Sequence, residues 1–172
     1  METKTILAVF AVVFTLVALG LTIAAVAIPI WWDFSSTITI GLFRSCVKYG
    51  TLNICLDNTD VSDRLQATRW LVVAACSLLG FALLFGFLLL CLKNKCLAVS
   101  ACVLDVVAGA CILAAVAITA EDTLNSPVST LDYGIAFILA CVALALAIIA
   151  GVIFAFATPK KSGTKGHVIS PM

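Results

Sequence analysis

The sequence predicts an all-α membrane protein, a bundle of four transmembrane helices with a small extracellular antiparallel β-sheet and with both termini in the cytoplasm. Three observations support this fold class. Of the 172 residues, 63% are hydrophobic and 11% are charged, whereas a soluble domain has about 25% charged residues. The apolar residues form four long runs, and lysines gather in the segments at one end of them. The chain is therefore expected to form one tetraspan domain over residues 1–172.

Each apolar run is long enough to cross a bilayer, which takes about 20 residues. The runs are rich in Leu and Ala, which favours helices, and helices satisfy their own backbone hydrogen bonds within lipid. Ala25-Val26-Ala27 is typical of a signal-peptidase site, but the apolar stretch before it exceeds the about 7–15 residues of a signal peptide. We therefore expect four spans, over residues 6–30, 70–92, 97–120 and 133–157.

Charged residues orient the spans. The turn at 93–95 reads Lys-Asn-Lys, and the tail at 158–172 has three lysines and no acidic residue. The loop at 121–132 instead has three acidic residues and no basic one. Because cytoplasmic segments are enriched in Lys and Arg, we expect the turn, the tail and the N-terminus in the cytoplasm. The loops at 31–69 and 121–132 are then extracellular.

The first of these loops contains two cysteines, Cys46 and Cys55. In an oxidising compartment a close pair of this kind forms a disulfide. The residues around them indicate a hairpin, because TITIGLF alternates polar and apolar residues and YGT offers a turn before LNICL. The bridge contributes roughly 2–3 kcal/mol in the chain-entropy model. A metal or redox pair is disfavoured, because no histidine lies nearby and the spacing is not C-x-x-C. Lys48 and Tyr49, at the hairpin tip, are the expected partner surface.

The second span has a predicted helix start outside the membrane. Asp63 followed by Gln66 makes a capping pair, from which a helix runs without a break into the span. Three tryptophans, Trp31, Trp32 and Trp70, are expected at the outer membrane edge, where such residues anchor a protein. Packing against the hairpin is a second role that is compatible with anchoring.

These features resemble the claudin superfamily. A tryptophan after the first span is followed by the pattern G-L-W/F-x-x-C, by a second cysteine and by an arginine at the mouth of the second span. The matching residues are Trp31 or Trp32, Gly41, Leu42, Phe43, Cys46, Cys55 and Arg69. The short interval from tryptophan to Gly41 is similar to that of the peripheral myelin and epithelial membrane protein branch. Phe43 stands where the family usually has tryptophan.

The resemblance implies a plasma-membrane protein of cell–cell or membrane–membrane contacts, junctions or lateral membrane organisation. Its implied partners, besides the lipid bilayer, are copies of itself or related tetraspan proteins, in cis or in trans. The alternative is an auxiliary subunit of a channel or receptor in the same membrane. A paracellular pore is disfavoured, because the first loop is short and its charges balance, which leaves no surface of a single sign for ion selectivity.

Other classes of function find no support in the sequence. The net charge of +1 gives no electrostatic case for nucleic-acid binding. The single histidine, His167, lies in the polar tail, and no nucleophile–base pair, metal-ligand cluster or phosphate loop is evident. We therefore expect no enzymatic activity and no cofactor.

Asp105 is the one acidic residue deep within a span. It lies about 13 Å into the third span at 1.5 Å per residue, where a charge costs at least about 2.5 kcal/mol. Thr15 of the first span lies at a similar depth and is the expected hydrogen-bond partner. We expect a neutral or hydrogen-bonded Asp105 that holds helices together; an ion or proton site is the alternative.

Three further features remain open to two interpretations. Small residues at every fourth position of the fourth span predict close packing within the bundle or self-association; they are Ala143, Ala147, Gly151 and Ala155. Cys91 and Cys96 flank the cytoplasmic turn and are either palmitoylated or buried thiols. The last three residues, 170–172, match a loose carboxyl-terminal motif of the kind that PDZ domains bind, or match it by chance.

Overall fold

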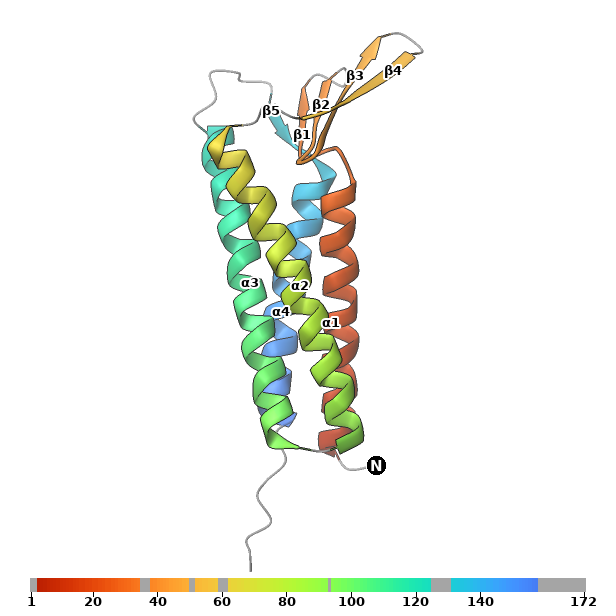
Figure 1. The fold of residues 1–172 in the computed structure, drawn as a ribbon, viewed down its shortest axis with the longest axis vertical. Helices are drawn as coiled ribbons and strands as arrows, with labels where there is room; N and C mark the ends of the chain where they lie inside the picture. Colours follow the sequence, from red (N-terminus) through yellow and green to blue (C-terminus); the bar gives the residue numbers. More distant parts are fainter. Residues whose placement is uncertain are drawn as a thin grey trace, which may run out of the picture.

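The computed structural model describes residues 3–34, 38–49, 52–58, 62–92, 94–124 and 131–157. Four long helices run side by side, and a small sheet lies at one end of them (Figure 1). The helices are α1 (Thr3–Ala27), α2 (Asp63–Leu92), α3 (Lys95–Leu124) and α4 (Ile135–Ala157). Each contains a segment long and apolar enough to cross a membrane.

α1 ends earlier than the first apolar run. Its backbone hydrogen bonds continue to Ile28, whose N–H donates to the carbonyl oxygen of Ala24 over 2.9 Å. Pro29 follows, and a proline disfavours helical backbone at the residue before it. The helix therefore covers residues 3–27, and the chain leaves it before the predicted end of the span at residue 30.

α2 begins outside its apolar run, as predicted, but with a different cap. The hydroxyl of Ser62 accepts a hydrogen bond from the N–H of Leu65 over 3.4 Å, and its carbonyl oxygen accepts one from Gln66 over 3.1 Å. Ser62 is therefore the N-cap residue, and the expectation that Asp63 caps the helix is wrong. Asp63 is the first helical residue. A carboxylate at this position stabilises the helix, because it lies near the positive end of the helix dipole.

The buried residues of every helix follow one spacing. They recur at alternating intervals of three and four residues, which is the seven-residue repeat of a left-handed coiled coil. Most of them are Ala or Thr; those of α1 include Ala8, Ala11, Thr15, Ala18, Thr22 and Ala25. Small side chains let the helix backbones approach closely, which matters because apolar burial gives no driving force between helices in lipid.

The fourth span shows the same spacing. Ala143, Ala147 and Gly151 are buried inside the bundle, whereas Ala155 is exposed. Packing within the bundle therefore accounts for three of the four small residues that the sequence singled out.

The helices form a four-cornered bundle. α1 packs against α2 and α4, and α3 packs against the same two helices. α1 and α3 therefore lie at opposite corners, and any side-chain contact between them crosses the centre of the bundle.

The sheet has five antiparallel strands in the order β4-β3-β2-β1-β5. They are β1 (Trp32–Phe34), β2 (Ile38–Ile40), β3 (Arg44–Tyr49), β4 (Leu52–Asp57) and β5 (Leu131–Tyr133). β5 comes from the segment between α3 and α4 and pairs with β1, so both loops at this end contribute to one sheet. The predicted bundle of four apolar helices with a small antiparallel sheet is confirmed.

Gly86 and Gly80 of α2 provide a matched test of the close packing. A Cβ atom on Gly86 would lie 2.9 Å from Phe154 and 2.9 Å from Val12, whereas one on Gly80 meets nothing within 4 Å. We expect Gly86→Ala to lower the free energy of unfolding by about 1–3 kcal/mol through overpacking, and Gly80→Ala to change it by less than about 1 kcal/mol. Unfolding in detergent micelles, followed by circular dichroism, measures both; equal effects would contradict the packing described here.

Candidate functional site

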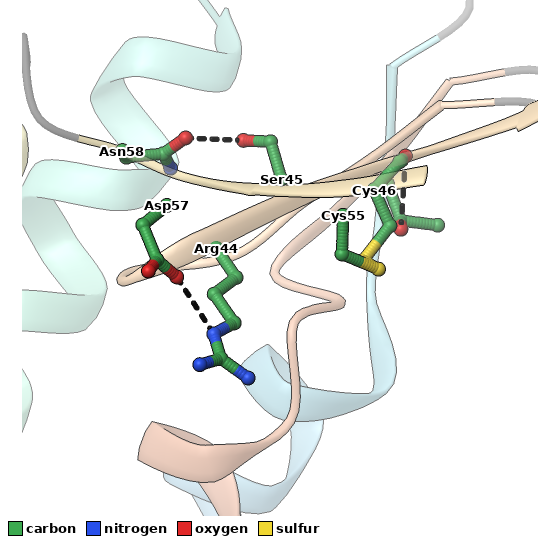
Figure 2. The surroundings of a disulfide bond; sticks show 7 residues. Arg44, Ser45, Cys46, Cys55, Asp57 and Asn58 are labelled. Carbon is green, nitrogen blue, oxygen red and sulfur yellow. Dashed lines mark hydrogen bonds and ion pairs between the residues drawn. A yellow bond between two sulfur atoms is a disulfide. The ribbon is translucent and has the colours of Figure 1, made fainter. Parts of the chain in front are cut away.

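The β3–β4 hairpin leans away from the helices at the sheet end (Figure 1). Cys46 and Cys55 lie directly opposite each other on these strands and form a disulfide with their Cα atoms 4.1 Å apart (Figure 2). The predicted bridge between these two cysteines is therefore present. Among the residues that the structure describes, no group of three His, Cys, Asp or Glu side chains could hold a metal ion.

Asn58 closes the base of the hairpin. Its side-chain oxygen accepts a hydrogen bond from Ser45 over 2.8 Å, as Figure 2 shows, and its side-chain nitrogen donates to the carbonyl oxygen of Gly41 over 3.2 Å. Its backbone N–H donates to Phe43 over 3.0 Å. Sequence reasoning missed this residue, because nothing local distinguishes a closing asparagine from one in a solvent-exposed turn.

Arg69 attaches the hairpin to α2. Its Nε donates a hydrogen bond to the carbonyl oxygen of Leu42, and one Nη donates to the carbonyl oxygen of Asn58 over 3.2 Å. The guanidinium carbon also lies 5.1 Å from the centre of the Phe43 ring, within the range of a cation–π contact. One side chain of α2 thus holds the segment before β3 and the residue after β4.

The segment Gly41-Leu42-Phe43 seats the hairpin on the bundle. A Cβ atom on Gly41 would lie 2.9 Å from the carbonyl oxygen of Arg44 and 2.5 Å from the Cα atom of Pro29, so only glycine fits there. Leu42 is fully buried in the core. Phe43 is 42% exposed and lies at the outside of this junction.

Trp31 and Trp32 are both buried, which agrees with the second expected role, packing against the hairpin, and anchoring at the membrane edge stays a prediction. The indole N–H of Trp31, which is fully buried, donates to the carbonyl oxygen of Ala25 over 2.7 Å. That of Trp32 donates to the hydroxyl of Thr123 in α3 over 3.0 Å. Both therefore pack the sheet onto the helices, whereas Trp70 is 66% exposed.

The outer part of the sheet exposes apolar side chains on one face. Successive residues of a strand face opposite sides, and the register places Ile38, Val47 and Ile54 in one row across β2, β3 and β4. Leu52 and Leu56 lie on the same side of β4. This set of five residues, called the apolar face below, is exposed except for the half-buried Val47.

The opposite face of the hairpin is polar and contains the disulfide. Lys48 is exposed there, in register with Asn53, and Arg44 pairs with Asp57 over 2.7 Å (Figure 2). Both partners of this ion pair are exposed, so it adds little stability. Tyr49 is in register with Leu52, and its side chain lies outside the described part of the structure. Lys48 and Tyr49 are thus consecutive residues at the end of β3.

Asp105 lies fully buried at the centre of the bundle. Its Oδ2 is 3.0 Å from the hydroxyl of Thr15, so the bond joins α1 and α3 across the bundle. The same hydroxyl lies 3.0 Å from the carbonyl oxygen of Ala11. Because the Thr15 hydroxyl has one proton, a protonated Asp105 satisfies both contacts, whereas a carboxylate competes with Ala11 for that proton. Gly151 of α4 faces this part of α3, where a Cβ atom on it would lie 3.1 Å from the side chain of Val106 and 3.4 Å from the Cβ atom of Asp105.

The remaining predicted sites lie at the other end of the bundle. Cys91 and Cys96 are both exposed, so the alternative of buried thiols is wrong for this pair, and palmitoylation stays a prediction. The carboxyl-terminal motif at 170–172 lies outside the described residues.

The model of the PMP-22/EMP/MP20/Claudin family matches residues 3–154, nearly the whole chain. The chain belongs to this family. It is therefore a multi-pass membrane protein with four apolar helices and a disulfide-linked sheet, and the resemblance seen in the sequence is confirmed at the level of the family. No curated protein sequence matches the chain.

Replacing Arg69 tests its role in holding the hairpin. Lysine keeps the charge but lacks the planar fork that bonds two carbonyl groups at once. We expect Arg69→Lys to destabilise the junction by about 1.5–3 kcal/mol and to speed hydrogen exchange in β3 and β4, measured by mass spectrometry. Arg64→Lys is the control, because Arg64 forms an exposed ion pair with Glu121 at 3.4 Å. Unchanged exchange in both variants would refute this role for Arg69.

Thr15 and Thr22 of α1 test the bond to Asp105. Both are buried, but the Thr22 hydroxyl bonds the carbonyl oxygen of Ala18 in its own helix. We expect Thr15→Val to lower the free energy of unfolding by about 1–3 kcal/mol, because Asp105 loses a buried partner, and Thr22→Val to have a smaller effect. Chemical denaturation in micelles compares them, and a larger loss in Thr22→Val would count against a stabilising bond to Asp105.

Proposed function

We propose that this family member is a non-enzymatic plasma-membrane protein that makes contacts between cells or membranes, or organises its own membrane laterally. The positive-inside pattern supports a topology with the sheet outside the cell and the 93–95 turn in the cytoplasm. The short first loop favours the peripheral myelin and epithelial membrane protein branch. In this proposal the helices anchor the protein, and the sheet binds copies of this chain or related tetraspan proteins.

The observation that supports this proposal most strongly is the outer end of the sheet. All six residues of β4 are exposed, and no strand in the described part of the chain pairs with its outer edge. Leu52, Ile54 and Leu56 are 61%, 44% and 66% exposed on this strand. An apolar face beside a free strand edge is typical of surfaces that bind another protein.

The disulfide and Arg69 support the same function in a different way. A hairpin of two short strands is marginally stable alone. A flexible loop also binds its partner more weakly than a rigid one, because ordering the loop on binding costs free energy. The bridge joins the two strands, and Arg69 fixes their base to α2. These two links hold the apolar face in one orientation relative to the helices.

Two adjacent residues of β4 provide the test. Ile54 lies on the apolar face and Asn53 on the opposite one, so Ile54→Lys and Asn53→Lys add the same charge to different faces. Expressed in non-adherent cells, the protein is expected to cluster at cell contacts. Ile54→Lys is expected to weaken clustering about tenfold, because burial of an Ile side chain contributes about 1.5–3 kcal/mol and 1.4 kcal/mol corresponds to tenfold. Asn53→Lys should cluster as the unmodified protein does.

The other outcomes point elsewhere. Loss of clustering in Asn53→Lys alone would assign the contact to the polar face near Lys48. Absence of clustering in every variant, together with co-purification of a larger membrane protein, would favour the auxiliary subunit of a channel or receptor.

A further inference from the structure

A hollow of about 160 Å³ lies beside the hairpin junction, at the sheet end of α2. It is lined by Phe43, Gln66, Arg69, Trp70 and Val73. The four α2 residues follow the spacing of a single helix face. Trp70 is 66% exposed and Val73 is 39% exposed, so the hollow opens on the outside of the bundle, where α2 meets lipid.

The hollow combines a cationic end with an apolar end. Arg69 donates two hydrogen bonds, to the carbonyl oxygens of Leu42 and Asn58. A guanidinium has five N–H groups, so further donors remain for a ligand. Among the described residues, no carboxylate forms an ion pair with Arg69. Its charge therefore lies beside an apolar wall without a described acidic partner, which suits an anionic ligand that also has an apolar part.

A second hollow on the other side of Phe43 lacks this combination. It has a volume of about 250 Å³ and is lined by Val26, Ala27, Pro29, Phe43 and Arg44. The guanidinium of Arg44 already pairs with Asp57 over 2.7 Å, so its charge is balanced within the chain. The hollow at Arg69 is therefore the better candidate for an anion.

The position of the Arg69 hollow identifies the class of ligand. The apolar run of α2 begins at Trp70, so Arg69 lies at the border between hydrocarbon and headgroups. Val73 lies four residues further along the helix, or about 6 Å deeper at 1.5 Å per residue. A phospholipid has the same order of parts, with a phosphate at the border and acyl chains below it.

We propose that this hollow binds one glycerophospholipid of the adjoining membrane leaflet. The phosphate accepts charge-assisted hydrogen bonds from the N–H groups that Arg69 has left, and the first part of an acyl chain packs against Trp70 and Val73. Phe43 belongs to the hairpin junction and lines the same hollow. The bound lipid therefore touches both the helix and the base of the sheet, and its occupancy stabilises their attachment.

Native mass spectrometry of the purified full chain in a maltoside detergent tests the proposal. The probes are phosphatidylcholine, diacylglycerol with the same acyl chains, and inorganic phosphate as a soluble competitor. The protein is expected to retain one phosphatidylcholine, to retain diacylglycerol about tenfold less, and to keep its lipid in the presence of inorganic phosphate. Tenfold is the loss expected when a charge-assisted bond is absent.

Two pairs of variants separate the hollow from general effects on folding. Gln66→Glu places a carboxylate beside the phosphate and should weaken retention about tenfold, whereas Ala67→Glu adds the same charge on the neighbouring exposed residue and should not. Val73→Trp fills the hollow and should also release the lipid, whereas Leu84→Trp enlarges another exposed residue of α2 and should not. Unchanged circular dichroism confirms that each variant folds.

Equal retention of phosphatidylcholine and diacylglycerol would overturn the proposal, because the phosphate would then not be recognised. Displacement by inorganic phosphate would assign the site to a soluble anion. Retention in both Gln66→Glu and Val73→Trp would place the lipid elsewhere on the protein. None of these measurements uses cell contact as a readout, so this proposal and the proposed function stand or fail separately.

Discussion

The fork of hydrogen bonds from Arg69 is the constraint on which the outer half of the molecule depends. The disulfide joins β3 to β4 but makes no connection to the helices. Arg69 makes that connection, because it bonds Leu42 before β3 and Asn58 after β4 from a rigid position on α2. A planar, permanently charged group with several donors is suited to this junction. The exposed hairpin is thereby oriented by the same helix that spans the membrane.

The bundle itself is organised around small side chains. Positions that repeat every seven residues are mostly Ala, with Thr and Gly between them, so the helices approach closely and gain dispersion contacts along their whole length. Asp105 lies in this seam, where it contacts the Thr15 hydroxyl and faces Gly151 of α4. A large side chain at either position would separate the helices and leave the carboxyl group without its partner. Close packing and the central polar bond therefore depend on each other.

Features with a local cause could be predicted from the sequence. Apolar length defines the spans, the spacing of Cys46 and Cys55 indicates their bridge, and counting residues from the membrane edge correctly paired Thr15 with Asp105. The four-residue spacing in the last span also grouped the exposed Ala155 with three residues that are buried in α4. Tertiary partners were not predictable in this way. The burial of Trp31 and the hydrogen bonds of Asn58 depend on which distant segments of the chain come together. No pattern in the neighbouring residues of the sequence indicates those contacts.

Strand β5 has a consequence for the order in which the protein is built. β1 is complete at residue 34, but its outer partner begins at residue 131, and ribosomes add about 5–20 residues per second. During synthesis the edge of β1 therefore stays open for roughly 5–20 s, while α2 and α3 are made. An unpaired edge is a site of mispairing for a nascent chain. β5 can pair with β1 only after α1, α2 and α3 have been synthesised. The complete five-stranded sheet therefore forms only when most of the helical bundle has been made.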